Sequence, residues 1–83
     1  MTPFVQWVAR EAKRVNAGDR DDIVGDFCCD AMRDKDFPTS GTITVIRQYM
    51  NRYPWYAREA FEDARNEYRA MNTIKRAARR GVA

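Results

Sequence analysis

The sequence predicts an all-α fold, a compact bundle of four main helices. Apolar residues recur every three to four positions in four separate segments, which is the spacing of one helix face. Proline and glycine interrupt this pattern between the segments, and no stretch shows the alternation typical of a half-buried strand. The chain has 83 residues, 45% of them apolar, with four phenylalanines, two tryptophans and four tyrosines. This composition is sufficient for one small domain with a single core.

The first helix is expected to begin at Pro3, because the fixed φ of proline suits a first helical turn. Gly18 is expected to end it as a C-cap, since glycine adopts the left-handed conformation at little cost. The apolar face between these two points comprises Phe4, Val5, Val8, Ala12 and Val15.

The second helix is predicted to begin near residues 19–22, where aspartates can cap backbone N–H groups and stabilise the positive end of the helix dipole. Two adjacent cysteines lie within it. Cys28 falls on the apolar face, where it is interpreted as a small buried residue, and Cys29 falls just off that face. The predicted apolar face comprises Ile23, Val24, Phe27, Cys28, Ala31 and Met32.

Pro38 is expected to stop the second helix, because proline lacks an N–H and forces Phe37 out of helical geometry. Phe37 should then fold back into the core. Asp34, near the helix end, is expected to accept N–H groups of this turn. A short third helix is predicted for residues 43–50, with Thr42 as its N-cap. Its inward-facing side chains are expected to be Ile43, Ile46, Tyr49 and Met50.

Pro54 opens the fourth and longest helix. We predict that residues 1–74 form a single helical domain and that residues 75–83 are a basic C-terminal extension of the last helix. Its apolar stripe comprises Ala57, Ala60, Phe61, Ala64, Tyr68 and Met71, and Ile74 is expected to extend it.

The residue inventory argues against catalysis and against a metal or cofactor. The chain has no histidine, so most acid–base and triad designs lack their base. Its two cysteines are half the ligands of a usual tetrahedral zinc site. No apolar run approaches the roughly 20 residues of a membrane span, and the N-terminus lacks a signal-peptide pattern. We therefore expect a non-enzymatic cytoplasmic protein with free thiols, no cofactor, no metal and no membrane contact.

Several motifs together resemble the YozE family of small bacterial proteins. They are "FVQWV" at residues 4–8, the Asp34-x-x-Phe37-Pro38 helix stop, Ile46-x-x-Tyr49-Met50 and "AFEDARNEY" at residues 60–68. The resemblance covers residues 4–70 and implies a fold similar to a sterile alpha motif. Folds of that kind are mostly protein-interaction modules, some of them head-to-tail oligomers, and a few bind nucleic acid. The family itself implies no specific activity.

Four aspartates form a regular row, spaced four residues apart, in and around the second helix. Successive members rotate only about 40° on a helix, so they are predicted to make one acidic ridge. Like charges at this spacing oppose helix formation, which favours basic partners for the ridge. The alternative is a solvated face partly neutralised by Arg33 and Lys35. The row consists of Asp22, Asp26, Asp30 and Asp34.

The last helix carries a basic stripe beside its apolar face, made of Arg58, Arg65, Arg69 and Arg76. At its start, Arg52, Tyr53, Trp55 and Tyr56 form an aromatic and basic corner. Such a corner can anchor a protein partner or stack bases while arginines contact phosphates. The structural alternative is that Tyr53 and Trp55 fasten the helix start to the core.

Three functional hypotheses follow. The first is a protein-interaction module whose candidate residues are the acidic ridge (Asp22, Asp26, Asp30) and the basic stripe with its corner (Arg52, Tyr53, Trp55, Arg58, Arg65, Arg69, Arg76). Its opposite charges permit head-to-tail self-association or docking on another protein. The second is a nucleic-acid-binding domain that uses the arginine stripe and the basic tail. The third is an inhibitor encoded by a phage or mobile element that docks on a bacterial protein complex.

Overall fold

The computed structural model of the chain describes residues 1–79 and 81, and it is a bundle of four α-helices. The all-α prediction is confirmed. The helices are α1 (Pro3–Asn16), α2 (Ile23–Arg33), α3 (Ile43–Met50) and α4 (Trp55–Arg79). No strand occurs in this described part of the chain.

The helix ends follow the predicted turn chemistry. Pro3 is the first residue of α1, and Thr2 caps it, its Oγ1 accepting the N–H of Val5 at 3.4 Å. Gly18 takes a φ of +82° beyond the end of α1, a conformation that glycine adopts without strain. Thr42 occupies the N-cap position of α3, but its side chain makes no capping hydrogen bond.

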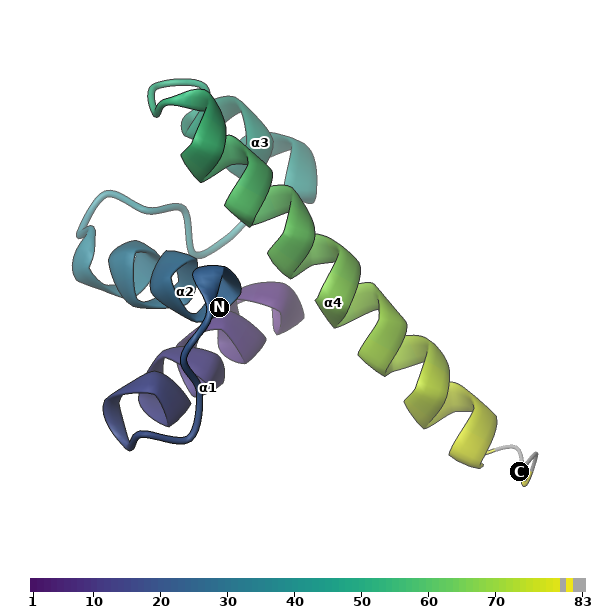
Figure 1. Cartoon of the computed structure of the whole chain (residues 1–83). Coiled ribbons are helices and arrows are strands. Elements are labelled where there is room, and N and C mark those ends of the chain that lie inside the picture. The colour runs from purple at the N-terminus through teal and green to yellow at the C-terminus, as the bar shows by residue number, and fades with distance from the viewer. Residues whose placement is uncertain (80, 82–83) are drawn as a thin grey trace.

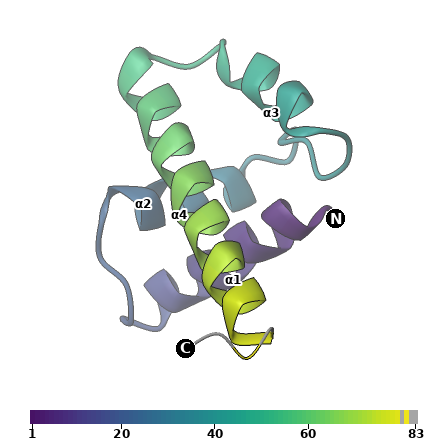
Figure 2. The same cartoon turned by 90° about the vertical axis from the view of Figure 1, so that its right-hand side faces the viewer.

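The four helices are arranged around α4. In Figure 2, α4 passes across α1 and α2, and α3 lies beside its first half. Contacts join α1 to α2 and each of the first three helices to α4. The C-terminal half of α4 then leaves the bundle, as Figure 1 shows in yellow-green. Its first half therefore belongs to the core, whereas its second half has neighbours only near its beginning.

Aromatic side chains form much of the core. Trp7 and Phe61 are among the fully buried residues. Phe37 is 5% exposed, which confirms that it folds back after the helix stop. It packs edge-on against Phe27 at 6.2 Å and against Tyr49 at 5.9 Å between ring centroids. The Phe37-Pro38 turn thus connects α2 to α3 through the core.

Two predictions about α2 are wrong, and its close contact with α1 explains the first. Its side towards α1 is centred on Gly25, where an added Cβ would lie 2.7 Å from Val15 Cγ2. On that same side Cys29 is buried, with its Sγ 3.8 Å from the carbonyl oxygen of Ala12, so it is not off the buried surface. Ile23, the first residue of α2, is not buried in the core and is 69% exposed.

Ile74 was also expected on the apolar stripe, and this is wrong as well. It is 69% exposed because α4 has already left the bundle at this point. The buried residues of α4 are confined to its first half, at Ala60, Phe61 and Ala64. No helix in the described ranges has both the length and the hydropathy that crossing a bilayer would require.

The packing of Phe37 generates the first prediction. Phe37→Ala should lower the free energy of unfolding by about 3–5 kcal/mol, because it removes a buried ring that two other aromatic side chains contact. Denaturant unfolding measures this loss. Val45→Ala, at an exposed position of α3, is the control and should change stability by about 0.5 kcal/mol or less. A loss below about 1 kcal/mol for Phe37→Ala would mean that the ring does not support the core.

Candidate functional site

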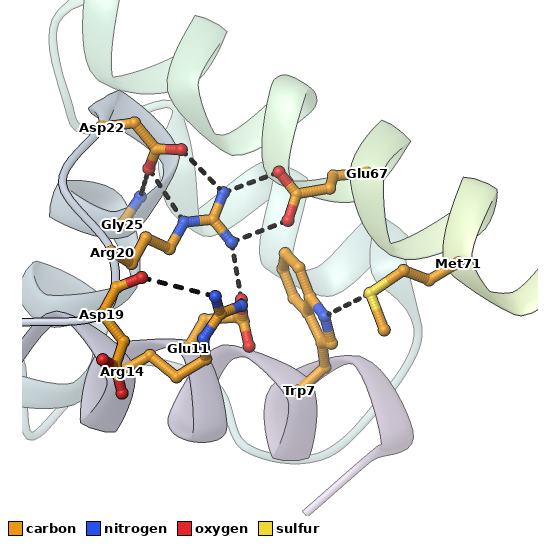
Figure 3. A network of polar contacts seen from close by, with 9 residues as sticks. All are labelled: Trp7, Glu11, Arg14, Asp19, Arg20, Asp22, Gly25, Glu67 and Met71. Carbon is orange, nitrogen blue, oxygen red and sulfur yellow. Dashed lines mark hydrogen bonds and ion pairs between the residues drawn. The ribbon is translucent and has the colours of Figure 1, made fainter. Parts of the chain in front are cut away.

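A buried arginine holds the middle of α4 against the rest of the bundle. Arg20 lies in the loop between α1 and α2, and its side chain is only 7% exposed. Its guanidinium donates to both carboxylate oxygens of Glu67 on α4, at 2.6 and 2.7 Å, and to Glu11 on α1 at 2.7 Å (Figure 3). These charge-assisted bonds raise the pKa of Arg20 above its ordinary value. One cation therefore ties together α1, the loop and α4.

Asp22 completes this network and also starts α2. Its carboxylate accepts from Arg20 at 2.9 and 3.1 Å, and its Oδ1 accepts the backbone N–H of Gly25 at 2.7 Å. The bond from Arg20 is the largest cause that lowers the pKa of Asp22, and the N-cap bond adds to it. Asp22 lies at the N-cap outside the helix, so the predicted ridge does not begin with a free carboxylate.

The position of Glu11 in the sequence indicates such a network, although the apolar periodicity by itself does not. Glu11 lies at 40° on a helical wheel counted from Trp7, between that residue and Val8 at 100°. An acid in the middle of a buried face requires a cationic partner. Nothing local in the sequence identifies Arg20 as that partner, because the two residues are nine positions apart and separated by the end of the first helix.

An open groove of about 540 Å³ lies between α2 and the first half of α4. Its lining includes the apolar side chains of Phe27, Ala31, Phe37, Met50, Ala57 and Ala60. Three large apolar or aromatic side chains beside it are strongly exposed: Ile23 at 69%, Trp55 at 66% and Tyr56 at 62%. Ile23 was expected in the core, but it is exposed and lines the same groove as the exposed Trp55 and Tyr56 of α4.

Carboxylates from both helices also line this groove. They are Asp26, Asp30, Asp34, Glu59 and Asp63. The groove lining contains no lysine or arginine from the described part of the chain. Asp26 and Asp30 are four residues apart on α2, and Glu59 and Asp63 are four apart on α4, a spacing at which like charges repel. The groove therefore combines apolar surface with negative charge, against which the described part of the chain sets one long ion pair, between the exposed side chains of Arg33 and Asp30 at 4.0 Å.

One groove carboxylate has partners of its own. The hydroxyl groups of Tyr49 and Tyr53 both donate to Asp34 Oδ2, the second at 2.7 Å. The bond from Tyr49 is the main cause that lowers the pKa of Asp34, and the same bond raises the pKa of Tyr49. The prediction that Asp34 accepts N–H groups of the following turn is confirmed, because its Oδ1 accepts the N–H of Asp36 at 3.0 Å and its carbonyl oxygen accepts that of Phe37 at 3.1 Å. This end of the groove is thus fixed by internal hydrogen bonds.

The aromatic and basic corner is partly engaged within the molecule. The guanidinium of Arg52 lies 3.9 Å from the ring centroid of Tyr49, a cation–π contact. Arg58 donates to the backbone carbonyl of Tyr53 at 2.7 Å. Trp55 contacts Tyr56 edge-on at 5.9 Å between centroids. Trp55 is thus an exposed wall of the acidic groove, whereas Arg52 and Arg58 stabilise the turn before α4.

The remaining arginines of the stripe lie along α4, away from the groove lining. Arg65 is partly buried and borders a small hollow with Ile43 and Tyr68. Arg69 and Arg76 are exposed. The structure thus divides the candidate residues into four places. Asp26, Asp30, Tyr53 and Trp55 line the groove; Arg52 and Arg58 form the corner; Arg65, Arg69 and Arg76 follow α4; and Asp22 belongs to the Arg20 network.

The groove is chemically suited to an amphipathic cation. Apolar surface favours desolvated side chains, and carboxylates from both sides attract positive charge. The two cysteines lie elsewhere, buried and as free thiols. Burial raises the pKa of Cys28 to about 12, so that thiol is not an available nucleophile at neutral pH.

Comparisons with protein-family models, curated proteins and solved structures find no match to this chain. The resemblance to the YozE family therefore stays a prediction that depends on its motifs.

The Arg20 network generates the second prediction. Arg20→Met should lower the free energy of unfolding by about 3–5 kcal/mol, because it removes the buried cation between Glu11 and Glu67 and leaves Glu11 with only the half-exposed Arg14, at 2.8 Å, as a partner. Thermal and denaturant unfolding measure the loss, and Arg33→Met, at an exposed arginine, is the control. In the double variant Glu11→Leu with Arg20→Met, the total loss should be smaller than the sum of the single losses. Additive losses would show that the two residues do not depend on each other.

Proposed function

We propose that this chain is a non-enzymatic protein-interaction module that binds a basic amphipathic helix of its partner in the groove between α2 and α4. One observation carries the proposal: the groove is apolar along its length, yet five carboxylates and no described basic residue line it. A helix with apolar residues on one side and lysine or arginine on its flanks complements both properties.

The distribution of exposed apolar side chains supports this assignment. Single exposed apolar residues are ordinary on a protein surface, but a cluster of them indicates a contact site. Ile23 on α2 and Trp55 and Tyr56 on α4 face one groove. Tryptophan and tyrosine are the side chains that most often dominate binding energy at protein interfaces. Ile23, Trp55 and Tyr56 are therefore the expected anchors.

The carboxylates supply selectivity rather than most of the affinity. Asp26 and Asp30 repel each other along α2, as do Glu59 and Asp63 along α4. A partner's basic side chains relieve this repulsion when they approach, whereas acidic segments and phosphates increase it. Catalytic carboxylate pairs need an enclosed environment that separates their pKa values, and Asp26 and Asp30 are exposed. Binding is thus the better interpretation of these acids.

A second candidate function is nucleic-acid binding, and one observation favours it. From Arg69 to Arg79 the last helix carries four basic residues and no acid, and Arg69, Lys75, Arg76 and Arg79 are all exposed. Such a surface attracts phosphates. Two other arginines favour it less, because Arg47 on α3 pairs with Glu62 at 2.7 Å and Arg58 of the stripe donates to a backbone carbonyl.

The third prediction tests groove binding with defined probes. The first probe is a synthetic amphipathic peptide of leucine, lysine and arginine, and the second is its counterpart with every basic residue replaced by glutamate. In a titration followed by backbone amide NMR, the basic peptide should shift the resonances of Asp26, Asp30, Trp55 and Asp63, and the acidic one should not. Asp26→Asn with Asp30→Asn should weaken the basic peptide about tenfold, as the loss of about 1.4 kcal/mol of attraction does.

The matched control is Asp19→Asn with Asp21→Asn, which removes the same charge from an exposed loop outside the groove lining. It should leave the affinity for the basic peptide within about twofold of wild type, because exposed charges at a distance are screened. If the shifts map outside the groove, or if both peptides bind alike, the groove is not the docking site.

The fourth prediction concerns nucleic acid. At low salt the chain should retard single- or double-stranded probes weakly, and at physiological salt binding should be absent, because the few phosphate contacts are lost as counterions compete. Arg69→Ala should flatten the dependence of log affinity on log salt. Micromolar or tighter binding at physiological salt would make nucleic acid the primary partner.

A further inference from the structure

We propose that the helix bound in the groove is the C-terminal segment of α4 from a second copy of this chain. This inference rests on the proposed function, and it names the partner. We call residues 70–79 of α4 the basic arm. The proposal joins two surfaces of the same molecule, the groove at the start of α4 and the basic arm at its end.

The basic arm begins at the last core contacts of α4. Trp7 makes these contacts: its ring packs on Tyr68 at 5.9 Å between centroids, and its Nε1–H donates to Met71 Sδ at 3.2 Å. After this point Ile74 is exposed, and so are the charged residues that follow it. Figure 1 shows this part of α4 projecting from the bundle. Of the large apolar side chains in the arm, Met71 is thus held by Trp7, whereas Ile74 has no covering surface in the monomer.

The basic arm is amphipathic, with an apolar side that is centred on the exposed Ile74. At 100° per residue its apolar side chains, Ala70, Ile74, Ala77 and Ala78, fall within about 100° of one another. Its charged side chains, Lys75, Arg76 and Arg79, fall on the opposite side, also within about 100°. The small alanines around Ile74 allow close approach to another surface. Long lysine and arginine side chains can bend from the flanks of a docked helix towards a charged rim.

The groove and the basic arm are complementary in both respects. Ile74 supplies one large apolar anchor for a groove walled by Ile23 and Trp55. The arm carries three cations and no acid, and the groove is lined by carboxylates and no described cation. Ile74 on α4 and Ile23 on α2 were both expected in the core, and both are exposed. In the proposed contact they lie on its two sides.

The contact can form only between molecules. Trp55 and Ile74 belong to one continuous helix, and their separation along it is about 28 Å at 1.5 Å per residue. The arm of a molecule therefore cannot reach the groove of the same molecule. Because the two surfaces differ, each copy can give its arm to one neighbour and receive the arm of another, which produces a ring or an open chain. The arm is only about 15 Å long, so the interface is small and the association weak.

The fifth prediction is tested by sedimentation of the full chain at several concentrations and two salt concentrations. Wild type should have a mass that rises with concentration from the monomer value of 9.7 kDa, and added salt should reduce the rise. The groove variant (Asp26→Asn, Asp30→Asn, Trp55→Ala) and the arm variant (Ile74→Ser, Lys75→Gln, Arg76→Gln) should each stay monomeric. All six positions are exposed, so both variants should keep the wild-type melting temperature.

A mixture of the two variants is the decisive sample. The groove variant keeps its arm and the arm variant keeps its groove, so one arm-to-groove contact can form between them. The remaining arm and groove of this pair are both altered, so no third molecule can add. An equimolar mixture should therefore give a dimer and nothing larger. The control variant Arg10→Gln with Lys13→Gln removes two exposed cations from α1 and should associate like wild type.

Three results would overturn this assignment. The first is a wild type that stays monomeric at several hundred micromolar and low salt. The second is association that persists in either variant, which would place the contact elsewhere. The third is a mixture that stays monomeric while wild type associates. If the wild type does not associate but the synthetic basic peptide still binds the groove, the proposed function stands and only the partner is wrong. If the peptide also fails to bind, both are wrong.

Discussion

The burial of Arg20 is the constraint on which the rest of the structure depends. Its guanidinium contacts three carboxylates from α1, the following loop and α4. Glu67, through which it holds α4, lies near the middle of that helix, just before the last core contact at Met71. The first half of α4 is therefore held across α2, where the groove forms, and the second half points away from the bundle. A buried cation is costly without partners, so this arrangement tolerates little variation at Glu11 or Glu67.

Eight acids of this chain fall into two groups that serve different purposes. Asp22, Asp34, Glu11, Glu62 and Glu67 each accept hydrogen bonds from arginine, tyrosine or backbone, and they fix the fold. Asp26, Glu59 and Asp63 have no ion pair with any described lysine or arginine and line one groove. The regular row of aspartates in the sequence thus consists of two structural ends and a central pair, in which Asp26 has no ion pair with a described residue and Asp30 has only a 4.0 Å contact with the exposed Arg33.

Local sequence signals were sufficient to predict the helices, but they were not sufficient to predict the angles at which the helices pack. Pro3, the aspartates before Ile23, and Pro54 mark helix starts by backbone chemistry, and the Phe37-Pro38 stop predicts the burial of Phe37. The groove was not predicted, because its carboxylates lie on two separate helices, and on each helix alone they resemble an ordinary solvated face. Which faces meet depends on Gly25, whose missing side chain allows α1 to approach α2 closely. This close approach buries Cys29 against α1, which the periodicity of a single helix does not predict.

The two tryptophans occupy opposite environments, and this makes the molecule its own optical reporter. Trp7 is fully buried beneath α4, with its N–H directed at the sulfur of Met71. Trp55 is exposed on the wall of the groove. Indole fluorescence shifts to longer wavelength when the ring meets water, so the two emissions differ in the native state. With Trp55 replaced by phenylalanine, the remaining signal follows the separation of α1 from α4. With Trp7 replaced instead, it follows events in the groove while the bundle stays folded.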